Sequence, residues 1–290
     1  MSKRKSARIW ELDFFRGLSI LRVVVDHAMY DFARLFNFWG SSGSTVLEFL
    51  HRYGVLYLDS DVRFFWRPAF LFVFFFTSGL CTSFSRNNFL RGARLVIVAS
   101  LVSIVTYLAD YLFGTNVYAM FGVLHCIAAV ILVFAVVDAL VRLSFKLVKK
   151  ITNSGNALAE RIVRIVVFIA IGIACAVVNK IYNVPLAEVM GNYTAIETNS
   201  RIMGLFFYCE NWWTADYFPL FPYISFFFLG AGAAGILYGK KRSLLPELDG
   251  KWHLFFTVPG RYSLFFYIGG QLLVVGLGAI VSLLVCGRAF

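Results

Sequence analysis

The chain has 290 residues, of which 60% are hydrophobic and only 15% are charged. Soluble domains carry about 25% charged residues, so this composition excludes a soluble globular protein and indicates an integral membrane protein. The formal net charge is +11, and a strongly basic charge of this kind is common in nucleic-acid-binding proteins. Here the basic residues follow membrane topology instead, and we expect no nucleic-acid partner.

Apolar stretches of about 20 residues predict membrane-spanning helices, because a helix of that length crosses the hydrocarbon core of a bilayer. No internal repeat or low-complexity linker divides the chain, so we expect a single domain, residues 1–290. Its fold class is expected to be all-α, a polytopic helical bundle with about seven transmembrane helices. The stretches lie at residues 14–36, 64–84, 95–113, 118–141, 162–181, 216–238 and 261–286.

Lys and Arg concentrate in alternate connections between these stretches. Segments 1–8, 85–94, 142–164 and 239–261 hold 18 of the 27 basic residues. Because basic loops stay in the cytoplasm, this bias predicts a cytoplasmic N-terminus and a multi-pass protein of the cell membrane, inner or plasma. Segment 142–164 is expected to be a basic, amphipathic element at the cytoplasmic surface. The oligomeric state is left open, a homo-oligomer included.

The first stretch is apolar enough to span a membrane, yet it carries six ionisable residues. A charged side chain at the centre of a bilayer costs at least about 2.5 kcal/mol, so such residues persist where they face a protein interior or a cavity. They therefore indicate either a functional site or a buried ion-pair network that locks helix packing. The residues are Arg16, Arg22, Asp26, His27, Asp31 and Arg34.

Helical periodicity arranges these residues in two stripes. At about 100° per residue, Arg16, His27 and Asp31 share one face. Arg22 and Asp26 lie on a neighbouring stripe and are spaced to pair with each other. Asp31 is one turn beyond His27, so its carboxylate can orient the imidazole and stabilise the imidazolium.

The end of the second stretch, FTSGLCTSFSRNNFLRGAR, combines small residues with arginines. Small residues such as Ser78 and Gly79 allow close approach of another backbone. Arg86, Arg91 and Arg94, at the expected cytoplasmic mouth, can bind phosphates. Ordinary positive-inside charge explains them as well.

A second histidine, His125, lies in FGVLHCIAA. Counted from the expected outer helix ends, His125 is ~10 Å deep and His27 ~13 Å deep at 1.5 Å per residue. Two histidines at similar depth can share a cavity. The alternative is that His125 is a core histidine whose hydrogen bonds are satisfied locally.

Two further polar residues lie near the outer side and in the last helix. Asp216 opens the sixth stretch, where Pro219 and Pro222 predict an irregular entry. It is beside outer loop 182–215, a candidate acceptor vestibule. Gln271 is the one strongly polar interior group of the last stretch.

Two ligand-like patterns have ordinary explanations. Residues 230–235 spell GxGxxG, the dinucleotide fingerprint, but no βαβ unit surrounds them. Inside an apolar stretch, small residues let helices approach closely. The five cysteines show no CxxC and no metal-ligand spacing, so we expect core thiols and no metal.

Several stretches resemble the bacterial branch of the heparan-alpha-glucosaminide N-acetyltransferase catalytic-domain family, within a wider group of membrane acyltransferases. They follow the family's order and span about residues 8–275. One departure is Gly270, because family members often have a histidine there, before the glutamine. The stretches are RIWELDFFRGLSILRVVVDHAMYD, FFFTSGLCTSFSRNN, FGVLHCIAA, DYFPLFPYISFFFLGAGAAG and GRYSLFFYIGGQ.

The resemblance implies an acyl-CoA-dependent transmembrane acyltransferase. It would move an acyl group from cytoplasmic acetyl-CoA, or another acyl-CoA, to an amine or hydroxyl of a sugar or glycan at the outer face. His27 matches the family histidine and would act as general base or as acylated nucleophile, oriented by Asp31 or, as the competing choice, Asp26. The residues assigned to CoA are Arg16, Ser78, Arg86 and Arg94, and the substrate-side candidates are His125, Asp216 and Gln271.

Two other functions fit the same residues. Intramembrane Asp, His and Arg also serve proton coupling, so a transporter of small solutes or lipids is the alternative. Many transporters contain internal repeats, however, and the two halves of this chain do not look alike. The third function is a structural or assembly protein whose charges act as packing pairs. Dependence on CoA distinguishes the acyltransferase from both.

Overall fold

The computed structural model describes residues 9–152, 156–182, 200, 202–209, 212 and 214–290. Within these residues the regular structure is helical, apart from an isolated bridge between Phe121 and Tyr217. The predicted all-α fold is therefore confirmed. The α-helices are α1 (Trp10–Tyr30), α2 (Thr45–Leu58), α3 (Asp61–Leu80), α4 (Asn88–Phe113), α5 (Val123–Thr152), α6 (Ala157–Ile181), α7 (Met203–Phe206), α8 (Tyr223–Leu237), α9 (Leu254–Arg261) and α10 (Ser263–Cys286).

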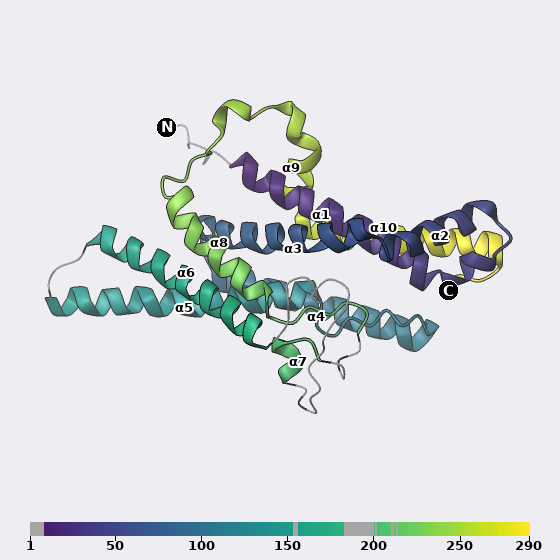
Figure 1. Cartoon of the computed structure of the whole chain (residues 1–290), viewed down its shortest axis with the longest axis horizontal. Helices are drawn as coiled ribbons and strands as arrows, with labels where there is room; N and C mark the ends of the chain where they lie inside the picture. The colour runs from purple at the N-terminus through teal and green to yellow at the C-terminus, as the bar shows by residue number, and fades with distance from the viewer. Residues whose placement is uncertain (1–8, 153–155, 183–199, 201, 210–211, 213) are drawn as a thin grey trace.

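The helices form two groups joined by α8 (Figure 1). Helices α1, α3 and α10 lie side by side in one group, and α9 packs against α1. Helices α4, α5 and α6 form the other, and α8 packs against both α3 and α6. An aromatic core fills the junction of α3, α5, α6 and α8. Its most buried rings are Phe75, Phe134, Phe168, Tyr223, Phe227 and Phe228.

Within the described residues, five helical segments are long and apolar enough to cross a membrane, which agrees with a polytopic membrane protein. The predicted count of about seven is not confirmed. The stretch at 216–238 corresponds to α8, which has only 15 residues. At 1.5 Å per residue it is about 22 Å long, shorter than the ~30 Å hydrocarbon core. The five segments are Asp61–Phe84, Asn88–Phe113, Val123–Ile151, Ala157–Ile181 and Ser263–Cys286.

Helix α5 differs from the expected span at both ends. It begins at Val123 rather than at 118, because the Asp216 carboxylate accepts the Val123 backbone N–H at 3.1 Å and caps the helix. It continues to Thr152, and α6 begins at Ala157. The expected surface element at 142–164 is therefore not a separate element: most of it is the ends of two long helices. Apolar runs mark the membrane core, not the helix ends.

Glycines bring α3 and α8 together backbone to backbone. A Cβ on Gly79 would lie 2.1 Å from the Phe227 carbonyl oxygen, and a Cβ on Gly230 would lie 2.1 Å from the Phe76 carbonyl oxygen. The GxGxxG segment at 230–235 is thus a helix-packing motif, as its position in an apolar stretch predicted.

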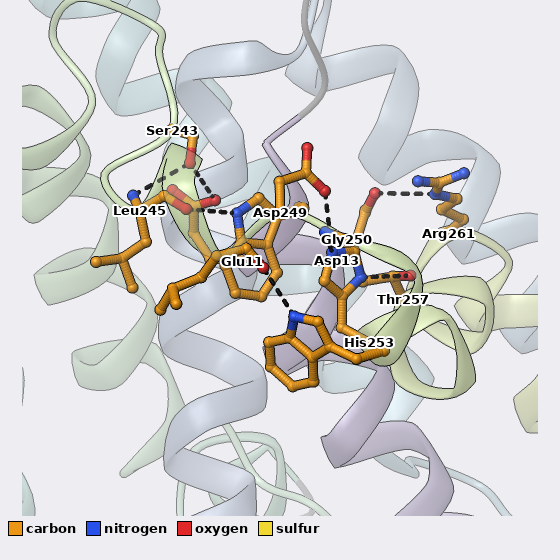
Figure 2. A network of polar contacts seen from close by, with 12 residues as sticks. Glu11, Asp13, Ser243, Leu245, Asp249, Gly250, His253, Thr257 and Arg261 are labelled. Atoms are coloured by element: carbon orange, nitrogen blue, oxygen red, sulfur yellow. Dashed lines mark hydrogen bonds and ion pairs between the residues drawn. The ribbon is translucent and has the colours of Figure 1, made fainter.

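Polar contacts hold the start of α1 to the segment that follows α8 (Figure 2). The Glu11 carboxylate accepts the Ser243 hydroxyl at 2.9 Å and the Leu244 backbone N–H at 2.6 Å. The Trp10 indole donates to the Leu245 carbonyl at 3.0 Å. Both segments lie on the side of the bundle that is expected to be cytoplasmic. The contacts therefore hold the start of α1 to residues 243–245 at that end of the bundle.

No pattern in the sequence predicts a role for His253, the one histidine of the basic segment 239–261. Its imidazole is 2% exposed and stacks on the Trp10 ring, with centroids 4.5 Å apart. Its Nε2 lies 3.0 Å from the Asp249 carboxylate and accepts the Gly250 backbone N–H at 3.0 Å. The ion pair between Arg261 and Asp13, at 3.4 Å, completes the network (Figure 2).

We expect Gly79→Ala to lower the midpoint temperature of unfolding in detergent by several degrees. The added methyl group must displace the α8 backbone, and overpacking of this kind costs about 1–3 kcal/mol. Gly276→Ala on α10 is the matched control, because nothing lies within 4 Å of a Cβ built there. Equal midpoints for the two variants would contradict close packing of α3 and α8.

Candidate functional site

A cavity of about 670 Å³ lies among α1, α3, α4, α5 and α10. Its volume is within the range of about 300–1,000 Å³ that is usual for small-molecule and cofactor sites. Four of its lining residues are arginines, and most of the others are apolar. The lining residues are Arg16, Ile20, Val23, Leu71, Phe74, Ser78, Ser85, Arg86, Asn87, Leu90, Arg91, Arg94, Leu95, Val123, Leu124, Ile127, Ser263, Leu264 and Tyr267.

The arginines gather at one end of the cavity. Arg86, Arg91 and Arg94 come from the start of α4 and the turn before it, and Arg16 comes from α1. The Arg16 guanidinium donates to the Ser263 hydroxyl at 2.7 Å, while its buried Nε has no partner among the described residues. No carboxylate in that part of the chain forms an ion pair with any of the four. This end of the cavity therefore suits an anion.

The body of the cavity is apolar and leads along α1. Ile20 and Val23 follow Arg16 at helical spacings of four and three, and the same stripe reaches His27. The opposite walls come from α3 and α5, and Ser78, 2% exposed, lies on the α3 wall. The cavity thus brings together all four residues assigned to CoA from the sequence, Arg16, Ser78, Arg86 and Arg94.

His27 is next to the cavity but does not line it. Its ring meets the ring of Tyr267 edge-on, with centroids 5.6 Å apart and planes at 77°. Tyr267 does line the cavity. The imidazole is therefore one aromatic ring away from the space that follows Arg16, Ile20 and Val23.

Asp31 does not contact His27 as expected. Its buried carboxylate, on a residue only 3% exposed, accepts the Gln271 side-chain N–H at 2.8 Å instead. The predicted hydrogen bond from Asp31 to His27 is not among the contacts of the described residues, because the carboxylate is engaged by α10. Gln271, expected near the substrate, is therefore brought to Asp31.

Asp26 belongs to an ion-pair cluster. One of its carboxylate oxygens accepts the Tyr57 hydroxyl and the Arg63 Nε–H, both at 3.0 Å, and lies 3.1 Å from Arg22. The predicted pairing of Arg22 with Asp26 is confirmed. These contacts join α1 to α2 and α3, so the packing explanation fits Asp26 better than a catalytic role does.

His125 lies in the first turn of α5, because that helix begins at Val123. The Ser103 hydroxyl donates to the Ala119 carbonyl at 2.6 Å, so its oxygen accepts the His125 Nε2–H at 3.2 Å. His125 therefore faces α4 and does not line the cavity. The predicted depth of His125 is wrong, and no recorded contact joins it to His27 in the described part of the chain.

Asp216 lies at the N-terminal end of α5. Its carboxylate caps Val123, and a Cβ on Gly122 would lie 2.1 Å from one of its oxygens. Burial raises the pKa of the neighbouring Tyr217, which stays protonated and donates to the Gly204 and Phe207 carbonyls. Since Val123 lines the cavity, Asp216 lies directly behind its wall. The expected acceptor vestibule at 182–215 lies largely outside the described residues.

Potential metal ligands do not gather in the residues that the structure describes. No group of three or more His, Cys, Asp or Glu side chains there is placed to hold a metal ion. The five cysteines, all within the described ranges, are free thiols.

Comparison with known families identifies the family of this chain. The model of the family described as heparan-alpha-glucosaminide N-acetyltransferase, catalytic, matches residues 8–272. Comparison with curated proteins and with solved structures gives no match. The family match covers nearly the whole chain and includes every residue of the cavity. The chain therefore belongs to the heparan-alpha-glucosaminide N-acetyltransferase catalytic-domain family, a family of membrane acetyltransferases.

Proposed function

We propose that the protein transfers an acetyl or similar acyl group from cytoplasmic acyl-CoA to an amine or hydroxyl group at the outer face, on a sugar or glycan. The observation that carries this proposal is the cavity. Its arginines form no ion pair with the described residues, and its apolar body ends beside His27. Acyl-CoA has two matching parts, a set of phosphates and a long arm that bears the thioester.

The arginine end suits the phosphates of CoA. Guanidinium groups bind phosphate oxygens through paired, charge-assisted hydrogen bonds. Among the described residues the buried Arg16 Nε lacks a partner, and Arg86, Arg91 and Arg94, which line the same cavity, form no ion pair. A ligand with several negative charges would supply the missing partners.

The distance from this end to His27 suits the arm of CoA. His27 follows Arg16 by eleven residues, or about 16 Å along α1 at 1.5 Å per residue. An extended pantetheine arm has a comparable length. With its phosphates at the arginines, the thioester would therefore lie near Tyr267 and His27.

His27 has two chemical roles open to it. As a general base, its imidazole takes the proton of the acceptor N–H or O–H while that atom attacks the thioester carbonyl, and the CoA thiolate leaves. As a nucleophile, an imidazole nitrogen attacks the carbonyl, displaces the CoA thiolate and then passes the acyl group to the acceptor. In both routes the Asp31 carboxylate favours the imidazolium that forms, through its negative charge. Asp31 lies one turn beyond His27 and is hydrogen-bonded to Gln271.

The orientation proposed is N-terminus inside. In Figure 1 the start of α1, the C-terminal end of α5 and the connection from α8 to α9 lie toward one end of the molecule, and α2 and the C-terminus lie at the other. The first end carries the basic segments, which favours placement in the cytoplasm of a cell membrane. The arginine end of the cavity then faces the cytoplasmic pool of acyl-CoA, and Asp216 faces the outer side.

Replacing His27 tests the chemistry. We expect His27→Ala to lower CoA release from acetyl-CoA by about 10²-fold or more, the usual effect of losing a positioned base. Detergent-purified protein and radiolabelled acetyl-CoA are used, with glucosamine as the acceptor probe. His51→Ala is the matched control. His51, on α2, forms a hydrogen bond with the Phe32 carbonyl and does not line the cavity.

The same label separates the two roles of His27. Label that stays on denatured wild-type protein, but not on His27→Ala, identifies the nucleophile. Label found only on glucosamine identifies the base. If the wild type neither binds acetyl-CoA nor releases CoA, the acyltransferase proposal is abandoned and transport into proteoliposomes is measured instead.

Arginine substitutions test the phosphate end. We expect Arg16→Met and Arg91→Met each to weaken CoA binding about tenfold in isothermal titration, because a hydrogen bond to a charged group contributes about 1.5–3 kcal/mol. Arg52→Met is the control, since Arg52 is exposed on α2 and does not line the cavity. Unchanged CoA affinity in both cavity variants would remove the arginines from the donor site.

A further inference from the structure

Tyr267 occupies the boundary between the cavity and His27. Its ring lines the cavity, and it meets the His27 ring edge-on at a centroid distance of 5.6 Å. His27 itself does not line the cavity. The ring of Tyr267 is therefore in contact with both the cavity and the imidazole.

Contacts one turn away on either side fix this ring in place. Ser263, Tyr267 and Gln271 are spaced four residues apart and share one face of α10. Ser263 accepts from Arg16 at 2.7 Å, and Gln271 donates to Asp31 at 2.8 Å. The two hydrogen bonds set the register of α10 on α1, and Tyr267 also packs against the aromatic core. A ring held in this way forms a wall of defined position.

Tyr267 follows Ser263, the partner of Arg16, by one turn of α10 and contacts His27, whereas the start of α5 lies away from the arginines of α4. Ser103 on α4 bonds to His125 at the start of α5. Arg91 precedes Ser103 by twelve residues, which is about 18 Å along α4 at 1.5 Å per residue. Val123 and Leu124, at the same end as His125, form the apolar end of the cavity. A donor with its phosphates at the arginines therefore has its acyl group at this apolar end.

We propose that Tyr267 is a positioning residue that holds a short acyl thioester beside His27 and limits the length of the acyl chain. This inference rests on the proposed function. The ring fills the space into which a longer chain would extend, so acetyl fits and hexanoyl meets the wall. Removal of the ring opens that space without touching the arginines.

The test measures binding, so that no acceptor has to be known. Dissociation constants for CoA, acetyl-CoA and hexanoyl-CoA are obtained by isothermal titration with the purified full chain in detergent. For the wild type we expect hexanoyl-CoA to bind at least about tenfold more weakly than acetyl-CoA, since one misfitted methylene alone changes discrimination about 10- to 200-fold. Tyr267→Ala is expected to abolish this difference, so that the ratio of the hexanoyl-CoA to the acetyl-CoA dissociation constant falls to about one.

Three further variants define the result. Tyr267→Phe keeps the ring and is expected to keep the wild-type discrimination. Tyr267→Leu repeats the test in a milder form if Tyr267→Ala does not fold. Phe265→Ala is the matched control, because Phe265 is an aromatic residue of the same helix that is 74% exposed and does not line the cavity.

The outcomes separate this inference from the proposed function. If CoA binds through the arginines but Tyr267→Ala and Tyr267→Leu both keep the wild-type ratio, the role of Tyr267 is overturned and the acyltransferase proposal stands. If the wild type binds no CoA, both are overturned. If Tyr267→Ala changes the ratio of the hexanoyl-CoA and acetyl-CoA dissociation constants and Phe265→Ala does not, the proposal that Tyr267 limits the acyl chain is supported.

Discussion

The need to give buried charges a partner decides which helices surround α1. Three acidic side chains in this helix and just after it are each met by a different element: Asp13 by Arg261 at the end of α9, Asp26 by Arg63 of α3, and Asp31 by Gln271 of α10. An unpaired charge in an apolar interior costs several kcal/mol, so these contacts are the conditions under which α1 can be buried at all. Two of these partners, α3 and α10, also line the cavity, together with α1, α4 and α5.

The sequence predicted the parts of this arrangement that depend on periodicity along one helix. The polar face of α1, the pairing of Arg22 with Asp26, the small-residue contacts of α8 and the all-α membrane fold all follow from spacing and hydropathy. The assignment of four residues to one CoA site depended on the family resemblance together with charge, because no local pattern joins residues on three different elements. These residues, which line one cavity, are Arg16, Ser78, Arg86 and Arg94.

What the sequence could not predict depends on contacts between distant segments. Helix α5 starts late because Asp216, far along the chain, caps it, and this moved His125 from the expected interior to a first turn. Asp31 was matched with His27 because they are one turn apart, but a side chain from α10 competes for the carboxylate. Gly270 is likewise constrained by a residue far away in the sequence. A Cβ there would lie 2.9 Å from the Val24 side chain, so a bulkier residue would require different packing of α10 on α1.

The buried Arg16 Nε without a partner has a thermodynamic consequence. A desolvated guanidinium nitrogen with no acceptor lowers the stability of the folded protein by itself. An anion that satisfies it binds the folded chain and not the unfolded one, so ligand and fold become linked: at a ligand concentration 100 times the dissociation constant the gain is about 2.7 kcal/mol. The amount of folded protein in the membrane would then follow the supply of its own donor.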